Sequence, residues 1–466
     1  MNPEWLIFIG DDLRYEREQL RDEGKDISKL SREFERIIEA VDHPDLRIEQ
    51  VEDRVDVVDS EVEADVIHEH REEVNSLLDD AQKLPERKGY DYHEPSDLDG
   101  IREMRPGASK TFDLPDKQLS DSVYGAWLGR CAGCLLGKPV EGWTIEKMHA
   151  ILEADDNYPI SWYPTSNVPE AVTEQWNVDP DGVFRSTIDR VEHMPEDDDL
   201  NYTIAGLDLL LSEGFGFASS DVARYWMRNI PILRTHTAER VAYRNFGNLI
   251  DPPKSASYRN PYREWIGALI RADPYGYVSV GDPEQAAELA WRDARVSHIK
   301  NGIYGSMWVA AMLAAAPEAD GIPMIIREGL KQVPEESRLT DAVRDVLNWH
   351  EQGVSYEDVF NRIHERWDET YYHHWCHTIS NAQIIAVGLL WSGGEFGPAI
   401  CQTVELGFDT DSSGATVGSV IGMYSGAEKI SKEWIDPLND TIESGIDGYQ
   451  RVPISELAEE TVSLSE

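Results

Sequence analysis

The segment from Ile384 to Ala427 constrains this chain more than any other, because it is long, apolar, rich in glycine and almost free of charge. The whole chain is 28% charged, so about twelve of these residues would carry a charge if charges were spread evenly. Four of them do: Glu395, Glu405, Asp409 and Asp411. A segment of this composition has to be buried in the interior of a folded protein.

Two of these acids, Asp409 and Asp411, stand two residues apart in the run from Gly407 to Gly414. Buried carboxylates at this spacing repel each other and stay ionised only where a cation neutralises them. The simplest such cation is a hard metal that prefers oxygen ligands, such as Mg²⁺. The run therefore predicts a metal site inside the apolar core.

The overall charge narrows the class of partner. The net charge is −45, which argues against binding nucleic acid or anionic membranes through a basic face. Only 13 of the 43 basic residues are lysine. Many carboxylates with few lysines indicate adaptation to a salty cytoplasm, where salt screens their repulsion. A cation buffer or a nucleic-acid mimic is the weaker alternative, because the apolar segments are typical of an enzyme core.

Targeting signals and cysteines also bear on where the protein is expected to be located. The chain shows no signal peptide and no stretch of the about 20 apolar residues that a membrane helix needs. Four cysteines without such a signal predict a reducing cytoplasm.

Periodicity predicts an all-α fold in three parts. Residues 1–116 are expected to form a charged helical extension and a Pro- and Gly-rich connector, with helices near 27–41 and 62–84. Residues 117–430 hold Ala- and Gly-rich segments that suit closely packed helices. Residues 431–466 are expected to form a C-terminal tail. The role of the extension and the oligomeric state are not indicated.

Three segments are candidates for one chemical site. In the first, glycines recur every four residues from Gly125 to Gly137, and Pro139 ends that helix so that it delivers Glu141 from its end. The second is the acidic run 196–199 and the third is 409–412, each followed by an apolar helix that its acids can cap. A run of three acids alone is weak evidence in so acidic a chain, where a solvated turn is the default.

Two other motifs suggest a different chemistry, either redox activity or zinc binding. Cys131-Ala-Gly-Cys134 has the spacing of a redox pair or half a zinc site, but it lies in the glycine-patterned helix and is better explained by buried thiols. The cluster His373-His374-Trp375-Cys376-His377 could bind zinc with a ligand from elsewhere. The apolar helix that follows it favours a role at a helix entry or a substrate pocket.

The chain resembles the ADP-ribosylglycohydrolase family over about residues 120–430. The features that carry the resemblance are the glycine-rich helix ending in Pro139-Val140-Glu141, the run 197–199, the segment Gly267…Arg271…Pro274-Tyr275-Gly276, Ser297-His298 with Asn301-Gly302, and the run 409–412. The chain is most similar to a longer, bacterial-type subgroup that includes dinitrogenase reductase-activating glycohydrolase and carries a charged helical extension. The resemblance implies a compact, multi-helix orthogonal bundle.

The resemblance also implies a site with two Mg²⁺ ions, or Mn²⁺ in their place. The metal ligands that it implies are Asp198, Asp199, Asp409, Asp411 and Ser412, with Asp197 assisting as a further oxygen ligand. Glu141 would be the acid–base residue beside the metals, and Asp198 would share in catalysis. The substrate-binding residues would be His298, Asn301, Gly407 and Phe408. His298 is equally well explained as a helix-capping histidine. The aromatic residues Trp162, Tyr163 and Trp176 could stack on adenine, although packing explains them better.

This sequence departs from the family pattern at several positions. Asp197 and Leu200 stand where threonines are usual, Cys134 where aspartate is usual, Phe408 where glycine is usual and Ser412 where threonine is usual. These changes bear on the substrate more than on the metals.

The predicted function is therefore Mg²⁺-dependent hydrolysis of the glycosidic bond at the ribose C1″ of an ADP-ribosylated protein or small molecule. One alternative is a non-catalytic module that binds ADP-ribose or a nucleotide. Another is a metal-dependent hydrolase of a different nucleoside or small glycoside.

Overall fold

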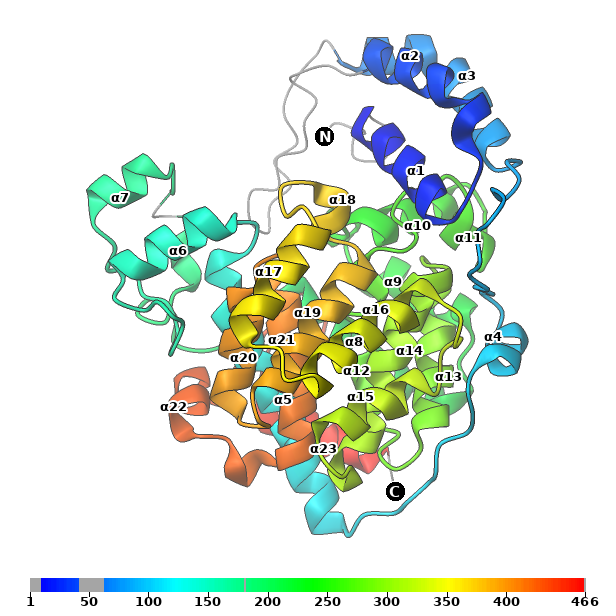
Figure 1. Ribbon diagram of the computed structural model, residues 1–466. Helices are drawn as coiled ribbons and strands as arrows, with labels where there is room; N and C mark the ends of the chain where they lie inside the picture. Colours follow the sequence, from blue (N-terminus) through cyan, green and yellow to red (C-terminus); the bar gives the residue numbers. More distant parts are fainter. Residues whose placement is uncertain (1–9, 42–62, 180–181, 465–466) are drawn as a thin grey trace.

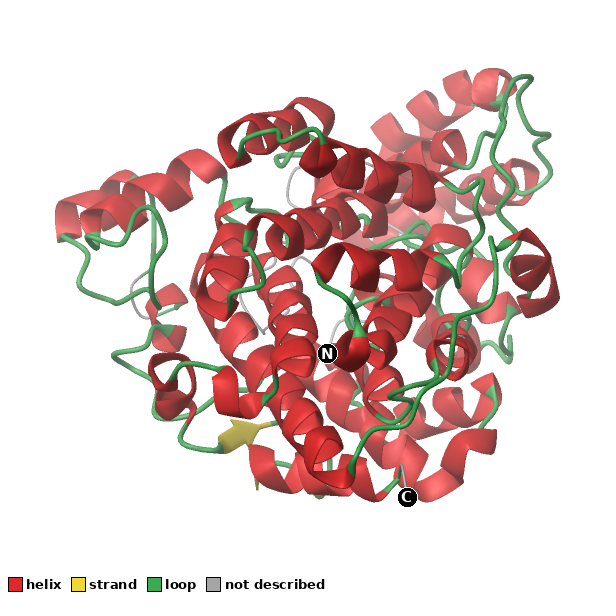
Figure 2. Ribbon diagram, turned by 60° about the horizontal axis from the view of Figure 1, so that its bottom comes forward, coloured by secondary structure: helices red, strands yellow, loops and turns green. Residues whose placement is uncertain are grey.

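The computed structural model describes residues 10–41, 63–179 and 182–464 of the chain. Helices make up nearly all of its regular structure, and the sheet of the described residues has two strands, as Figure 2 shows. The all-α prediction is confirmed. Within the described ranges, none of the helices has both the length and the apolar character needed to cross a membrane.

The N-terminal extension forms a small helical layer of its own beside the main body (Figure 1). Its helices and that of the connector are α1 (Gly10–Asp22), α2 (Ser31–Val41), α3 (Glu63–Ala81) and α4 (Leu98–Met104). The predicted helices near 27–41 and 62–84 correspond to α2 and α3. The first of them starts later than expected, because residues 27–29 form a 3₁₀ turn that Asp26 caps.

The main body consists of many short helices around a continuous hydrophobic core. They are α5 (Asp116–Gly137), α6 (Ile145–Ala154), α7 (Glu170–Gln175), α8 (Asp198–Glu213), α9 (Ser219–Asn229), α10 (Thr237–Gly247), α11 (Lys254–Ser257), α12 (Asp273–Tyr277), α13 (Pro283–Ala294), α14 (Lys300–Ala315), α15 (Ile322–Leu330), α16 (Arg338–Glu351), α17 (Tyr356–Arg366), α18 (Tyr372–Trp375), α19 (Thr378–Trp391), α20 (Phe396–Glu405), α21 (Thr410–Ser425), α22 (Lys432–Ile435) and α23 (Ile454–Ser463). Helices α6 and α7 project from one side (Figure 1).

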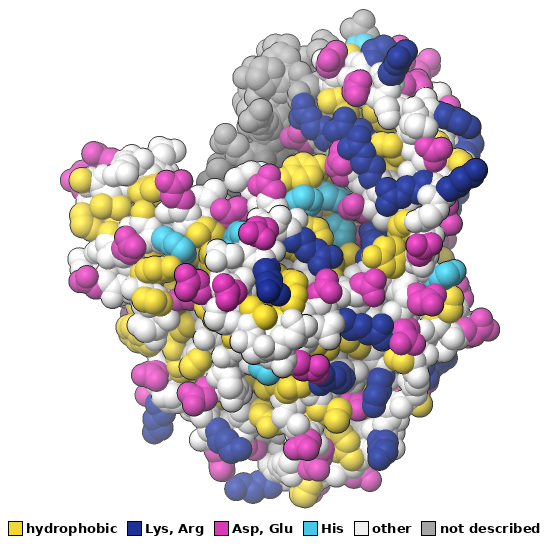
Figure 3. Space-filling view, viewed as in Figure 1, with side chains coloured by type: hydrophobic (Ala, Val, Ile, Leu, Met, Phe, Trp, Pro, Cys, Tyr) yellow, Lys and Arg dark blue, Asp and Glu magenta, His cyan; other side chains and the backbone are white. Residues whose placement is uncertain are grey.

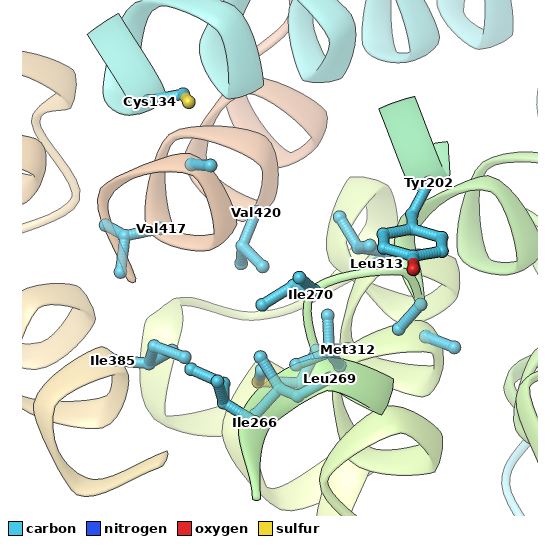
Figure 4. Close-up of a cluster of buried hydrophobic side chains, with 14 of the residues drawn as sticks. Cys134, Tyr202, Ile266, Leu269, Ile270, Met312, Leu313, Ile385, Val417 and Val420 are labelled. Atoms are coloured by element: carbon cyan, nitrogen blue, oxygen red, sulfur yellow. The ribbon is translucent and has the colours of Figure 1, made fainter. Parts of the chain in front are cut away.

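Helices α5 and α21 pack against each other through two stripes of glycine. Gly125, Gly129 and Gly133 of α5 lie against the backbone of Gly422, Gly418 and Gly414 of α21, respectively. The pairing runs in opposite directions along the two sequences, so the helices are antiparallel. Figure 4 shows Cys134 of α5 and Val417 and Val420 of α21 in this part of the core. Because no side chain separates the backbones, the end of α5 and the start of α21 are brought together.

The last segment of the chain also packs on α5. Trp127 donates a hydrogen bond through Nε1 to Thr461 Oγ1 of α23 at 3.0 Å. The strands β1 (Thr441–Glu443) and β2 (Arg451–Pro453) pair in antiparallel fashion, with Ile442 opposite Val452. Residues 431–464 are therefore part of the packed body.

A network of buried charges joins α1 to the main body. Arg263 binds Glu16 and Glu23, each at 2.6 Å, and Lys300 reaches Glu23 at 3.1 Å. Gln19 donates to Glu264 at 2.8 Å. Buried charges have to be paired and hydrogen-bonded, and these residues satisfy one another across the contact. The acidic face of α1 is thereby explained by its docking.

Candidate metal centre

Three helix ends meet at one point of the main body. Glu141 follows α5 and the 3₁₀ turn Lys138–Val140, Asp197 to Asp199 begin α8, and Asp409 to Ser412 begin α21. Candidate ligand atoms of Glu141, Asp409 and Asp411 lie within 4.8 Å of one another. The same limit holds for the triad 197–199 and for Cys134 with Asp197 and Asp411. These overlapping groups form one acidic cluster from segments that lie far apart in sequence.

The cluster is buried and only partly hydrogen-bonded. Asp199 accepts a hydrogen bond from Ser412 Oγ at 3.0 Å through Oδ2, and its Oδ1 lies 3.4 Å from Arg130. Asp411 Oδ1 is buried, and no described residue supplies it with a hydrogen-bond partner. A buried carboxylate oxygen in that state fits a cation, because leaving it unpaired would be costly. The donor set of carboxylates and a hydroxyl suits Mg²⁺ or Mn²⁺.

Burial and mutual repulsion raise the pKa values of several acids in the cluster. Burial, and next the charge of Asp411, raise the pKa of both Asp409 and Asp199 well above the usual range. Burial and the charge of Asp197 raise the pKa of Asp411 to about 7. These groups are ionised together only when positive charge enters the cluster. A divalent metal ion can supply that charge, whereas protonation instead neutralises some of the carboxyl groups.

Glu141 stands at the edge of the cluster where solvent reaches it. Although one side of the residue is exposed, burial of its carboxyl and the charge of Asp411 raise its pKa well above the usual range. A carboxyl group that faces the acidic cluster, on a residue that solvent reaches, can exchange a proton with a water molecule.

Gly407 and Phe408 form the turn into the cluster. Both have left-handed backbone conformations, with φ of 72° and 62°. Phe408 is completely buried, and its ring packs against His364 at a centroid distance of 5.5 Å. The structure gives these two residues a clear role in turning the chain toward Asp409, and their assignment to substrate binding stays a prediction.

His298 and Asn301 belong to other buried networks. His298 Nδ1 lies 2.9 Å from Ser297 Oγ, beside the ion pair of Arg271 and Glu239. Asn301 donates to Glu264 at 2.8 Å and accepts from the backbone N–H of Leu339 at 3.0 Å. These hydrogen bonds hold helices together, and the substrate-binding role of both residues remains an expectation from the resemblance.

The aromatic residues of the projecting segment are mainly structural. Tyr163 is buried and donates to the carbonyl oxygen of Trp434 at 2.8 Å. Trp162 packs its ring edge-on to Tyr163 at 5.8 Å and remains 38% exposed. Trp176 is partly buried against the core.

Candidate ligand atoms of Asp22, His373 and His377 lie within 4.8 Å of one another, and His377 Nε2 is buried without a hydrogen-bond partner among the described residues, but the other ring hydrogen bonds of the two histidines do not favour zinc. His373 accepts through Nδ1 from Trp265 at 3.1 Å, and its Nε2 lies 2.8 Å from Asp22. His377 accepts through Nδ1 from the backbone N–H of Ile379 at 3.1 Å. A neutral histidine that binds a metal through Nε2 keeps its proton on Nδ1, which must then donate. Both Nδ1 atoms instead face groups that can only donate, so each Nε2 carries the proton. The cluster joins α1 to α18.

Cys131 and Cys134 are free, buried thiols on α5, as predicted. Burial raises the pKa of Cys131 to about 12, whereas a reactive thiolate needs a lowered pKa.

Two cations of the centre were missed in the sequence analysis. Arg130 is completely buried and binds Asp273 at 2.9 Å as well as approaching Asp199. Lys138 lies 2.9 Å from Asp197. A signal was available, since an arginine inside an otherwise small and apolar helix is rarely buried without a partner.

The chain is similar to known proteins over most of its length. The family model of ADP-ribosylglycohydrolase matches residues 115–465. A solved ADP-ribosylglycohydrolase-related protein complex contains a chain that is 18% identical, with a TM-score of 0.45; the alignment covers 75% of this chain and 98% of that one. No curated protein sequence matches the chain.

Proposed function

This chain belongs to the ADP-ribosylglycohydrolase family, a family of hydrolases that act on ADP-ribosylated substrates, and we propose that it is a Mg²⁺-dependent member that hydrolyses the glycosidic bond at the ribose C1″. The products would be ADP-ribose and the free acceptor. The acceptor itself, whether protein side chain or small molecule, is left to experiment.

One observation supports this proposal most directly. Three helix ends bring six carboxylates together, four of them on buried residues, and the buried Oδ1 of Asp411 has no hydrogen-bond partner among the described residues. A structural cluster of acids would be expected to satisfy each oxygen with donors. An unsatisfied oxygen beside carboxylates that resist ionisation is what a divalent ion would complete.

The residues that would hold two ions are Asp198, Asp199, Asp409, Asp411 and Ser412. When bound, the metal supplies Lewis acidity and a fixed positive charge beside the substrate's ribose. Mg²⁺ is proposed first because carboxylate and hydroxyl oxygens are the donors it prefers, and Mn²⁺ accepts the same set.

The chain's own residues would manage the proton. Glu141 lies at the solvent-facing edge of the cluster, so its carboxylate can take a proton from the attacking water. The carboxylates behind it favour the positive charge that develops on the ribose in an oxocarbenium-like transition state. Gly407 and Phe408 set the direction in which Asp409 enters the cluster.

The test is release of ADP-ribose from a mixture of ADP-ribosylated proteins and small molecules, in high-salt buffer with and without Mg²⁺. Glu141→Gln should lower turnover by about 10²-fold or more, the range for a general acid–base residue, and leave metal binding intact. Glu146→Gln is the matched control, because it is an exposed glutamate five residues away. The double variant Asp409→Ala/Asp411→Ala should abolish both turnover and metal binding.

Other outcomes separate the alternatives. Tight binding of ADP-ribose without any turnover would contradict the proposal and favour a binding module. Turnover confined to nucleosides or simple glycosides would favour a hydrolase of another substrate class.

A further inference from the structure

Lys138 is a positive charge placed inside the acidic cluster. It is the first residue after α5, and its side chain is only 9% exposed. Its Nζ lies 2.9 Å from Oδ2 of Asp197, which is 1% exposed. The charge of Lys138 also acts on Glu141 and Asp411, whose pKa values it lowers against the effect of burial and of the neighbouring acids.

Asp197 has little bonding capacity left for a metal ion. Its Oδ1 accepts the backbone N–H of Asp199 at 2.9 Å, which caps the start of α8. Its Oδ2 accepts from Lys138, and the thiol of Cys134 donates to the same carboxylate. Both carboxylate oxygens of Asp197 are therefore already engaged by groups of the protein.

We propose that Lys138 and Asp197 form a charge-neutral pair built into the centre, in which Asp197 positions the start of α8 and does not bind metal, while Lys138 weakens the attraction of the cluster for divalent ions. The proposal rests on the metal-dependent function proposed above. It differs from the expectation that Asp197 is a metal ligand. Lys138 is accordingly a residue that determines metal affinity.

The physical argument concerns the balance of charge. A unit positive charge a few ångströms from a divalent ion repels it by several times the thermal energy even at an effective dielectric constant of about 20. Removing that charge should tighten metal binding, and removing the whole pair should restore the original balance. If Asp197 were instead a ligand, removing the pair would delete a ligand oxygen.

The experiment is a double-mutant cycle on the full chain, with Mn²⁺ and then Mg²⁺ titrated at constant ionic strength and the bound ions counted by calorimetry and by electron paramagnetic resonance of Mn²⁺. Lys138→Met should bind Mn²⁺ at least tenfold more tightly than wild type. Asp197→Asn should bind it more weakly, because Lys138 is then free to compete. Lys138→Met/Asp197→Asn should keep the wild-type number of ions and lie within about threefold of wild-type affinity.

Lys117→Met is the matched control. It removes the same charge from the same helix, but at its exposed start, about 30 Å from Lys138 at 1.5 Å per residue. Unchanged affinity in Lys138→Met relative to this control would overturn the proposal. So would loss of one bound ion in the double variant.

Failure of the proposed function is distinguishable. If the wild type binds no divalent ion, the metal-dependent function is wrong, and the pair is tested by thermal unfolding without metal. Lys138→Met should then unfold at a lower temperature than Lys138→Met/Asp197→Asn, because it leaves a buried carboxylate unpaired. Additive effects of the two substitutions would overturn the pairing.

Discussion

Gly414 of α21 lies directly against Gly133 of α5, so close that a Cβ on Gly414 would stand 2.5 Å from the carbonyl oxygen of Gly133. This contact lies one helical turn from the acidic cluster, since Asp409 and Asp411 begin α21. Because Glu141 follows the end of α5, the spacing between the two helices helps to set how far Glu141 lies from Asp409 and Asp411.

Gly414→Ala is expected to destabilise the protein by about 1–3 kcal/mol or more, because the new methyl group meets backbone that has no room to move. The midpoint of urea unfolding measures this loss. Gly216→Ala is the control, since a Cβ there meets nothing within 4 Å. Equal stability of the two variants would show that the helices separate without cost.

The metal-free protein is expected to lose stability as the pH rises from about 5 to 8. The pKa of Asp411 is about 7 in the folded protein and about 3.9 in an unfolded chain, so its contribution is complete below pH 4 and is lost as the pH rises through 7. The difference corresponds to at most about 4 kcal/mol.

Asp411→Asn should have a flatter pH dependence of the free energy of unfolding in EDTA and should be more stable than wild type at pH 8. Comparing the two proteins removes the general effect of the other acids. Mg²⁺ should reverse the trend in wild type, because metal binding requires ionised ligands. Parallel pH profiles of the two proteins would contradict this account.

Phe408 offers a test of backbone strain at the centre. A residue other than glycine in the left-handed region costs about 1–2 kcal/mol, and the buried ring of Phe408 offsets that cost. Phe408→Gly should therefore be more stable than Phe408→Ala by about 1 kcal/mol. At Phe396, which is helical, the order should be reversed. The unfolding temperatures of the four variants test both predicted orders of stability.

The large negative charge predicts dependence on salt. Figure 3 shows acidic side chains scattered over one face of the molecule, among lysine and arginine side chains. With a net charge of −45, repulsion should fall as KCl increases from 0.1 to about 2 M, and the unfolding temperature should rise. Sucrose at equal osmolality is the control. An unchanged unfolding temperature in KCl would refute adaptation to a salty cytoplasm.

Local patterns were sufficient to predict the all-α class, the helices near 27–41 and 62–84, and the segments around Glu141 and 409–412, whereas the acidic run 197–199 was joined to them by the resemblance to the family. Asp409 and Asp411 stood out because acid is rare around them, and the glycines of α5 because they recur at the helical period. Both signals arise within one helix or turn, so no knowledge of tertiary structure was needed.

The pairs that depend on tertiary contact could not be predicted. Lys138 and Asp197 are 59 residues apart, and nothing in either segment indicates that the two side chains pair. Glu94 of the connector binds Arg338, which is 244 residues away and also holds Glu264. Such partners are chosen by how helices pack, and a single sequence carries no record of that choice.

The buried charges that join α1 to the main body have a consequence for how this chain can be divided. Arg263 and Arg240 are nearly inaccessible, and the carboxylates that pair with them belong to α1 and to Glu23, the residue directly after it. A fragment that began at the connector would keep the arginines and lose those partners. The extension is thus not a portable module that can be trimmed or exchanged; its acids and the arginines of the main body have to change together.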